Sequence, residues 1–130
     1  MSEFEAAEIS AEYLGLVGGY MANYATHLTI YLTLLFAYCA AMYVAGNKLD
    51  TLQVFIATVL FVVAAEFQVL TMAAWVNSAQ AIIAELANLV PAFDPPRLLE
   101  VRQIFGLVIW NVGIVAALVF TWRVRRRNIA

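Results

Sequence analysis

Charged residues are scarce in this sequence, and the side chains that build most active sites are scarcer still. Only 12% of the 130 residues are charged, about half the share usual in soluble domains. The single cysteine, Cys39, excludes an internal disulfide, and with one histidine, His27, there is no pair at zinc-ligand spacing. There is no phosphate-binding glycine loop and no nucleophile elbow around any serine. We therefore expect no enzymatic activity, no metal site and no cofactor.

Proline is absent until Pro91, so long helices meet no proline breaker in the first 90 residues. Hydrophobic residues make up 65% of the chain, against roughly 45–50% in soluble domains. A soluble chain of this size cannot bury so much apolar surface in one core. The sequence therefore predicts an all-α, single-domain membrane protein with three transmembrane helices.

Turn-forming residues at 46–50 and 91–96 separate the three predicted helices. The first turn is too short to do more than reverse the chain, so the first two helices should form an antiparallel hairpin. The predicted segments are an acidic amphipathic segment at 1–19, spans at 20–46 and 51–76, an amphipathic helical extension at 77–90, and a third span at 95–126.

Two details of these helices stay open. Gly15, Gly18 and Gly19 weaken the first helix and allow a bend before the span. An unbroken helix over 51–90 would be about 60 Å long, roughly twice the hydrocarbon thickness of a bilayer. It must then extend out of the membrane, which is the form we expect, or bend near residues 75–78 and lie at the interface.

Basic residues predict the orientation. One side of the membrane should hold Lys48, Arg123, Arg125, Arg126 and Arg127, and the side with more basic residues is normally cytoplasmic. The acidic N-terminus and the 77–100 segment then lie outside, and the C-terminus lies inside. We expect the inner (plasma) membrane of a bacterium. The arginine cluster also suits anionic lipid, whereas a tail this short is not expected to bind nucleic acid.

The first span has two contrasting faces when it is placed on a helix. One face carries polar-tipped aromatic side chains and the histidine: Tyr13, Tyr20, Tyr24, His27, Tyr31 and Tyr38. The opposite face carries small side chains: Gly18, Ala22, Ala25, Thr29, Thr33 and Ala40. Small residues let a neighbouring helix approach closely, so this small face is predicted to pack. The tyrosine face is either a helix–helix interface or the wall of a wetted cavity or pore.

Glu66 is the only charged residue between Thr51 and Ala84. A carboxylate within a span is costly and normally faces a partner, a cavity or a pore. It either ties helices together, takes part in ion or proton passage, or sits at the interface without a role. His27 lies at nearly the same depth in the membrane as Glu66 when residues are counted from Lys48. A contact between His27 and Glu66 is therefore one interpretation. In the other, His27 forms hydrogen bonds with tyrosines and threonines.

The third helix contributes further candidates. Arg102 lies at the depth of Glu66 and either neutralises it or reaches outward to the surface. Asn111 is expected to bond a neighbouring helix, as structural support or as a selectivity element. Gly106, Gly113 and Ala117 form the small face of this helix. Polar residues beyond the second span are candidates for a vestibule: Asn77, Gln80 and Asn88.

These patterns support three hypotheses. The first is a homo-oligomer around a symmetry axis, forming a channel for ions or small solutes that is lined by Glu66, His27 and the tyrosine face. The second is a non-catalytic accessory or scaffold subunit of a larger membrane complex. In layout the chain also resembles three-span phage holins, with the N-terminus outside and a basic tail inside. That resemblance implies a lysis pore, although the long 77–90 segment departs from the holin pattern.

Overall fold

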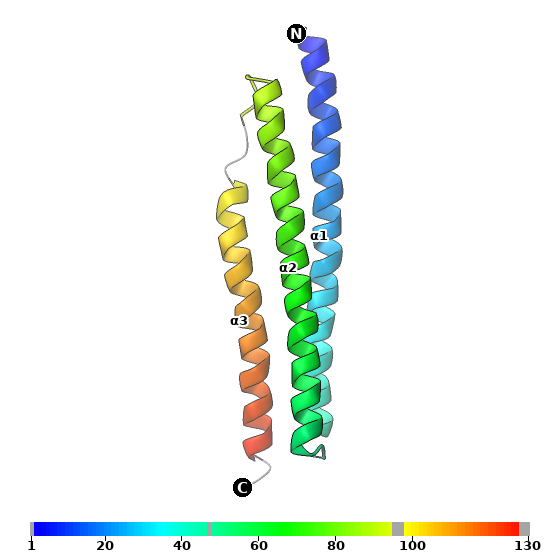
Figure 1. The fold of residues 1–130 in the computed structure, drawn as a ribbon, viewed down its shortest axis with the longest axis vertical. Coiled ribbons are helices and arrows are strands. Elements are labelled where there is room, and N and C mark those ends of the chain that lie inside the picture. The colour runs from blue at the N-terminus through cyan, green and yellow to red at the C-terminus, as the bar shows by residue number, and fades with distance from the viewer. Residues whose placement is uncertain (1, 47, 95–97, 128–130) are drawn as a thin grey trace.

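The computed structural model describes residues 2–46, 48–94 and 98–127, without the side chains of 98–105 and 127. Over these residues it consists of three helices: α1 (Glu3–Ala45), α2 (Thr51–Leu89) and α3 (Leu98–Arg127) (Figure 1). Each contains a segment long and apolar enough to cross a membrane, which in α3 is Gly106–Arg126. The predictions of an all-helical chain and of a membrane protein are confirmed at this level.

Capping side chains determine where the first two helices begin. At the start of α2 the Asp50 side chain accepts a hydrogen bond from the backbone N–H of Gln53 (2.8 Å), and the Gln53 side chain accepts one from the backbone of Asp50. Ser2 and Glu5 form the same reciprocal pair at the start of α1. Each pair satisfies backbone donors that the first helical turn leaves free.

Both long helices run without interruption. With 43 and 39 residues, α1 and α2 are about 64 and 58 Å long at 1.5 Å per residue. The helix continues through Gly15, Gly18 and Gly19, so the bend that these glycines allowed is not present. Likewise α2 passes residues 75–78 as helix. Glycine lowers helix propensity by about 1 kcal/mol, which packing along a long hairpin readily offsets.

Side-chain contacts join α1 to α2 along nearly their whole length. From the turn outward, the pairs are Tyr38 with Thr58, His27 with Gln68, Tyr20 with Trp75, and Tyr13 with Glu85. Residue numbers fall on α1 as they rise on α2, which is the signature of an antiparallel hairpin in constant register. The segment at 77–89 therefore continues the hairpin as part of one unbroken helix.

Helix α3 packs against both other helices, but it is shorter, so the N-terminal part of α1 and the C-terminal part of α2 extend beyond it (Figure 1). The buried cluster between the three helices includes Tyr31, Ala65, Val69, Ile114 and Ala117. Near the α1–α2 turn, Arg125 at the end of α3 donates a hydrogen bond to Thr51 (3.4 Å). The turn and the end of α3 thus share one end of the bundle, called here the turn end.

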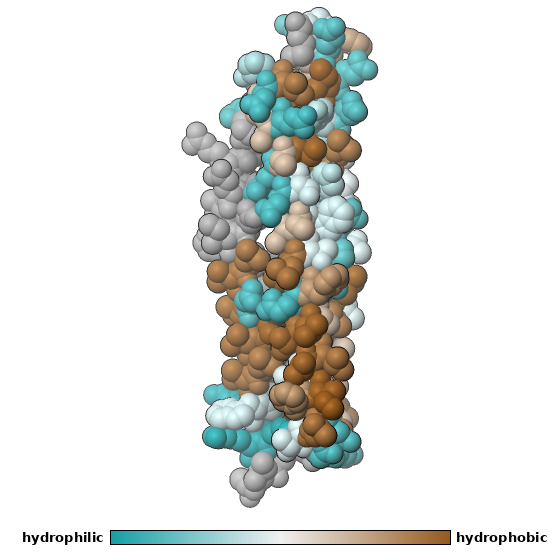
Figure 2. All heavy atoms as spheres, in the orientation of Figure 1, coloured by the Kyte–Doolittle hydropathy of each residue, from teal (hydrophilic) through white to brown (hydrophobic). Residues whose placement is uncertain are grey.

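The surface of the molecule is divided along its length. On the face drawn in Figure 2, hydrophobic side chains gather over the half nearer the turn end, and hydrophilic side chains lie at both extremities. Large apolar side chains on the outer surface of α2 stay exposed, including Phe55, Leu60, Val63 and Phe67. An exposed apolar surface of this kind is expected where the solvent is lipid.

Candidate functional site

The tyrosine face of α1 is turned into the protein. Tyr31 is 1% exposed and Tyr38 is 7% exposed, while Tyr20 and Tyr24 are half-buried. The Tyr38 ring stacks on Phe61 with centroids 4.1 Å apart, and its hydroxyl lies 2.8 Å from the Thr58 hydroxyl. At Tyr31 and Tyr38 this face therefore forms a helix–helix interface within the chain.

His27 pairs with Gln68, and not with Glu66. The Nδ1 atom of His27 lies 2.7 Å from the Oε1 atom of Gln68. A carbonyl oxygen only accepts, so with this amide orientation Nδ1 carries the proton. The depth comparison that suggested Glu66 ignored rotation. Residues 66 and 68 are about 200° apart around a helix, so only one of them can face α1.

Glu66 lies on the flank of α2 and is half-buried. Its carboxylate is within electrostatic range of the Tyr31 hydroxyl. Ala65 beside it is fully buried, and a rotation of about 100° from that position brings Glu66 toward the edge of the core. Among the residues whose side chains are described, Glu66 has no hydrogen-bond partner. Arg102, the predicted neutralising partner, lies outside the described side chains.

Tyr31 is the point at which all three helices meet. Its hydroxyl donates to the backbone carbonyl of Trp110 on α3, and the two rings are in edge contact at 5.4 Å. A side chain at Gly113 would collide with this hydroxyl, because an added Cβ would lie 2.5 Å from it. Gly113 therefore gives α3 the room to approach α1. Ala117 is buried one turn further along, and Gly106 lines a cavity between the helices.

The remaining polar candidates lie at the periphery. Asn111 is exposed and donates to the Leu107 carbonyl of its own helix (2.8 Å), so among the described residues the expected bond to a neighbouring helix is not made. The amide side chains outside the second span differ in burial, since Asn77 and Asn88 are exposed and Gln80 is half-buried. They do not form one cluster with His27, from which they are separated by several turns of helix.

The small face of α1 is turned outward. Ala22, Thr29 and Thr33 are exposed, and a Cβ added to Gly18 would meet nothing within 4 Å. The threonine hydroxyls bond carbonyls one turn back in their own helix, Thr29 to Ala25 and Thr33 to Thr29. Within the described residues the larger aromatic side chains of the opposite face fill the contact with α2, so the predicted packing of the small face stays a prediction about another helix.

Charged residues gather at the two ends of the bundle. Lys48, Arg123 and Arg126 are exposed at the turn end, and the Arg126 guanidinium stacks 3.9 Å over the Trp122 ring. The side chain of Arg127 lies outside the described ones. The far end holds the glutamates of the N-terminal segment and Glu85. There Tyr13 donates to Glu85 (3.2 Å), and partial desolvation together with this carboxylate raises the pKa of Tyr13 above its usual 10.0.

Sequence reasoning missed two residues that organise this layer, Gln68 and Trp110. Both are uncharged, and neither stood out against the apolar background. The signal that would have found Gln68 is the antiparallel register, which pairs residue 27 with 68 once the turn is placed.

Across the described residues, no three His, Cys, Asp or Glu side chains come together as a metal site.

Comparison with known proteins finds no matching family model, no matching curated protein and no matching solved structure.

Proposed function

We propose that this protein is a non-catalytic membrane subunit that works in an assembly, first of all with copies of itself, and that the outward small face of α1 is the contact surface. The observation that carries the proposal is the contrast between outward faces. The outer face of α2 is covered by large side chains such as Phe55 and Phe67, whereas that of α1 carries Ala22, Thr29 and Thr33 beside the exposed Phe36.

Small residues favour helix association in a membrane. Lipid is as apolar as leucine, so helices associate through close backbone approach and van der Waals packing. On α1 a shallow groove is lined by Thr29, Leu32, Thr33, Phe36, Ala37 and Ala40. A second helix can approach along the small side chains of this groove, beside Leu32 and Phe36, and the threonine hydroxyls need no new partner.

The distribution of charge supports an orientation for the assembly. Lys48 gathers with Arg123, Arg125 and Arg126 at the turn end, and the carboxylates of α1 gather at the other. With the basic end in the cytoplasm, the N-terminus lies outside. The N-terminal part of α1 and the C-terminal part of α2, which extend beyond α3, then form an acidic projection outside the membrane. A bacterial inner membrane is the proposed location.

A channel is the second candidate, and Glu66 is the observation that favours it. Tyr31, Tyr38 and His27 bond groups within the chain, so they are not proposed as a pore lining. Glu66 is only half-buried and has no hydrogen bond among the described side chains. If copies meet through α1, a carboxylate on the flank of α2 can face a neighbouring subunit or a conduit. A holin-like lysis pore is a further form of this candidate.

Cysteine cross-linking in native membranes tests the assembly. In a Cys39→Ala background, Thr33→Cys places a thiol on the small face, and Val63→Cys places one at matched depth on the outer face of α2. We expect oxidation to yield a disulfide-linked dimer from Thr33→Cys and monomer from Val63→Cys. Equal cross-linking of both, or of neither, would contradict assembly through α1.

Conductance separates the two candidates. Purified protein in liposomes is compared with its Glu66→Gln variant over a range of pH. A scaffold subunit predicts no conductance from either protein. A channel predicts conductance whose pH dependence changes in the variant, because glutamine cannot titrate. Abrupt killing of the expressing host at a fixed time would instead favour a lysis pore.

A further inference from the structure

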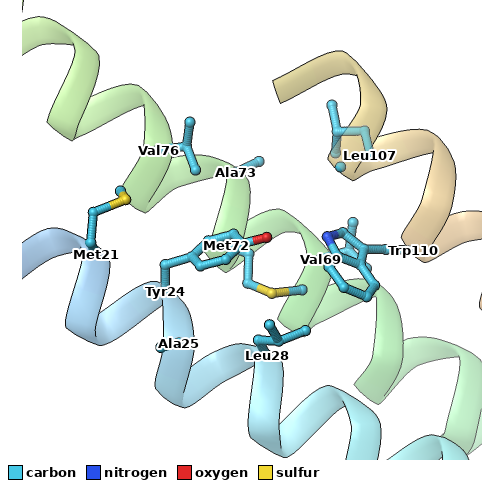
Figure 3. Close-up of a pocket in the computed structure, with 11 residues that line it drawn as sticks. Met21, Tyr24, Ala25, Leu28, Val69, Met72, Ala73, Val76, Leu107 and Trp110 are labelled. Atoms are coloured by element: carbon cyan, nitrogen blue, oxygen red, sulfur yellow. The ribbon is translucent and has the colours of Figure 1, made fainter. Parts of the chain in front are cut away.

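A cavity of about 320 Å³ lies between the three helices, on the far side of His27 from the turn end. Residues from every helix line it, and most of its wall is apolar, including Leu28, Val69, Met72 and Leu107 (Figure 3). A partly open cavity of this size is at the lower end of the range for small-molecule sites. Left empty in a membrane it would forfeit packing contacts.

Two polar groups enter this cavity from opposite walls. Figure 3 shows Tyr24 reaching in from α1 and Trp110 from α3, with the hydroxyl and the ring nitrogen turned toward each other. Neither group has a hydrogen bond to a side chain or backbone atom that the structure describes. A phenol and an indole N–H both donate, so an acceptor between them would satisfy both.

The depth of the cavity indicates which acceptor. If the basic residues of the turn end mark one membrane surface, the hydrocarbon core extends about 30 Å from there. Tyr24 is 21 residues from the end of α1 at Ala45, or about 32 Å along the helix. The cavity therefore lies at the opposite boundary of the hydrocarbon. Apolar chains meet polar groups at this depth, so a carbonyl-bearing amphiphile can place its chain inward and its carbonyl at the two donors.

We propose that the cavity is a binding site for an apolar molecule with a hydrogen-bond-accepting carbonyl, which receives hydrogen bonds from Tyr24 Oη and Trp110 Nε1. An ester-linked phospholipid and a lipid-soluble quinone share this chemistry. The bound chain would occupy the apolar wall formed by Leu28, Val69 and Met72. This site does not depend on the assembly proposed above, since all three helices of one chain line it.

Fluorescence of Trp110 tests the site directly. Trp75→Phe and Trp122→Phe leave Trp110 as the sole tryptophan. This variant is reconstituted in vesicles of ether-linked phospholipid, which has no ester carbonyl. Two probes are then added separately: an ester-linked phosphatidylcholine brominated in its acyl chains, and a decyl-substituted benzoquinone. Both quench tryptophan on contact. We expect saturable quenching of Trp110 by one of them, well above its mole fraction in the membrane.

The carbonyl is tested with Tyr24→Phe, which removes one donor and keeps the ring. Loss of one hydrogen bond of about 1 kcal/mol should weaken the preferred probe about fivefold. Tyr20→Phe, one turn along α1 and not part of the lining, should leave it unchanged. Gly106→Leu should fill the cavity, because a Cβ there already lies 3.6 Å from Trp110 Nε1, and should abolish saturation.

Preference for the brominated ester identifies a membrane lipid as the ligand, and preference for the benzoquinone identifies a lipid-soluble quinone. Either result supports the site. Quenching by both probes in simple proportion to mole fraction, unchanged in Tyr24→Phe, would overturn it. Circular dichroism and gel filtration of each variant show whether the fold is kept, and the Tyr24→Phe comparison decides the outcome if Gly106→Leu fails to fold.

Discussion

The two faces of α1 satisfy their polar atoms in opposite ways. On the inward face, Tyr31 and His27 bond groups on α3 and α2. On the outward face, Thr29 and Thr33 bond carbonyls of their own helix. In a membrane both solutions remove unpaired polar groups from lipid, but only the first holds the chain together. The inward face therefore determines the fold, and the outward face is left for contacts with other molecules.

The largest expected effect comes from truncating Tyr31. Tyr31→Ala removes a fully buried ring, its contact with Trp110 and the hydrogen bond between them. By comparison with buried aromatic truncations, unfolding should become about 3–5 kcal/mol easier. The measurement is sodium dodecyl sulfate titration of the protein in mixed micelles, followed by circular dichroism.

Thr33→Ala is the matched control for Tyr31→Ala, since it lies on the opposite face about half a turn along the same helix. We expect it to leave the stability of the single chain nearly unchanged, because its hydroxyl bonds only its own helix. Similar losses from both substitutions would show that the outward face also contributes to the fold of one chain.

The next largest effect should come from adding bulk where α3 approaches α1. A Cβ at Gly113 would lie 2.5 Å from the Tyr31 hydroxyl, whereas one at Gly18 would meet nothing. Gly113→Leu should therefore destabilise the three-helix unit by about 1–3 kcal/mol through overpacking. Gly18→Leu should not, and it should instead reduce dimer cross-linking at the small face. If Gly113→Leu is as stable as the parent protein in the same titration, α3 does not pack on Tyr31.

Much of the fold follows from the pattern of the sequence. Composition and the two turns predict three long helices. The bend that the glycines at 15, 18 and 19 allowed did not occur, because the low helix propensity of glycine is a weak effect beside packing along a long hairpin.

The candidate site was less accessible to sequence reasoning. Periodicity separates the tyrosine face of α1 from its small face, but it does not say which one meets α2. Both are plausible interfaces in lipid, since small residues permit close approach and aromatic residues supply area. To predict which side chains pair across two helices, both the register and the rotation of each helix are needed. Depth alone suggested Glu66 as the partner of His27, whereas the rotation of α2 makes Gln68 the partner.

The smallest expected effect concerns the His27–Gln68 contact, and it tests whether the inward face owes its stability to packing or to hydrogen bonds. A double-mutant cycle with His27→Leu and Gln68→Leu isolates the pair. Hydrogen bonds between membrane helices contribute about 0.6 kcal/mol on average and rarely more than about 1.7. The coupling energy from the same detergent titration should fall in that range, well below the loss from Tyr31→Ala. A coupling of several kcal/mol would mean that the polar pair, more than the aromatic packing, determines which face of α1 is turned inward. A coupling of zero, with His27→Leu alone stabilising, would mean that the pair persists for a reason other than stability. In this second case the inward face could no longer be assigned to the fold alone, and the contrast between the two faces of α1 would lose its physical basis.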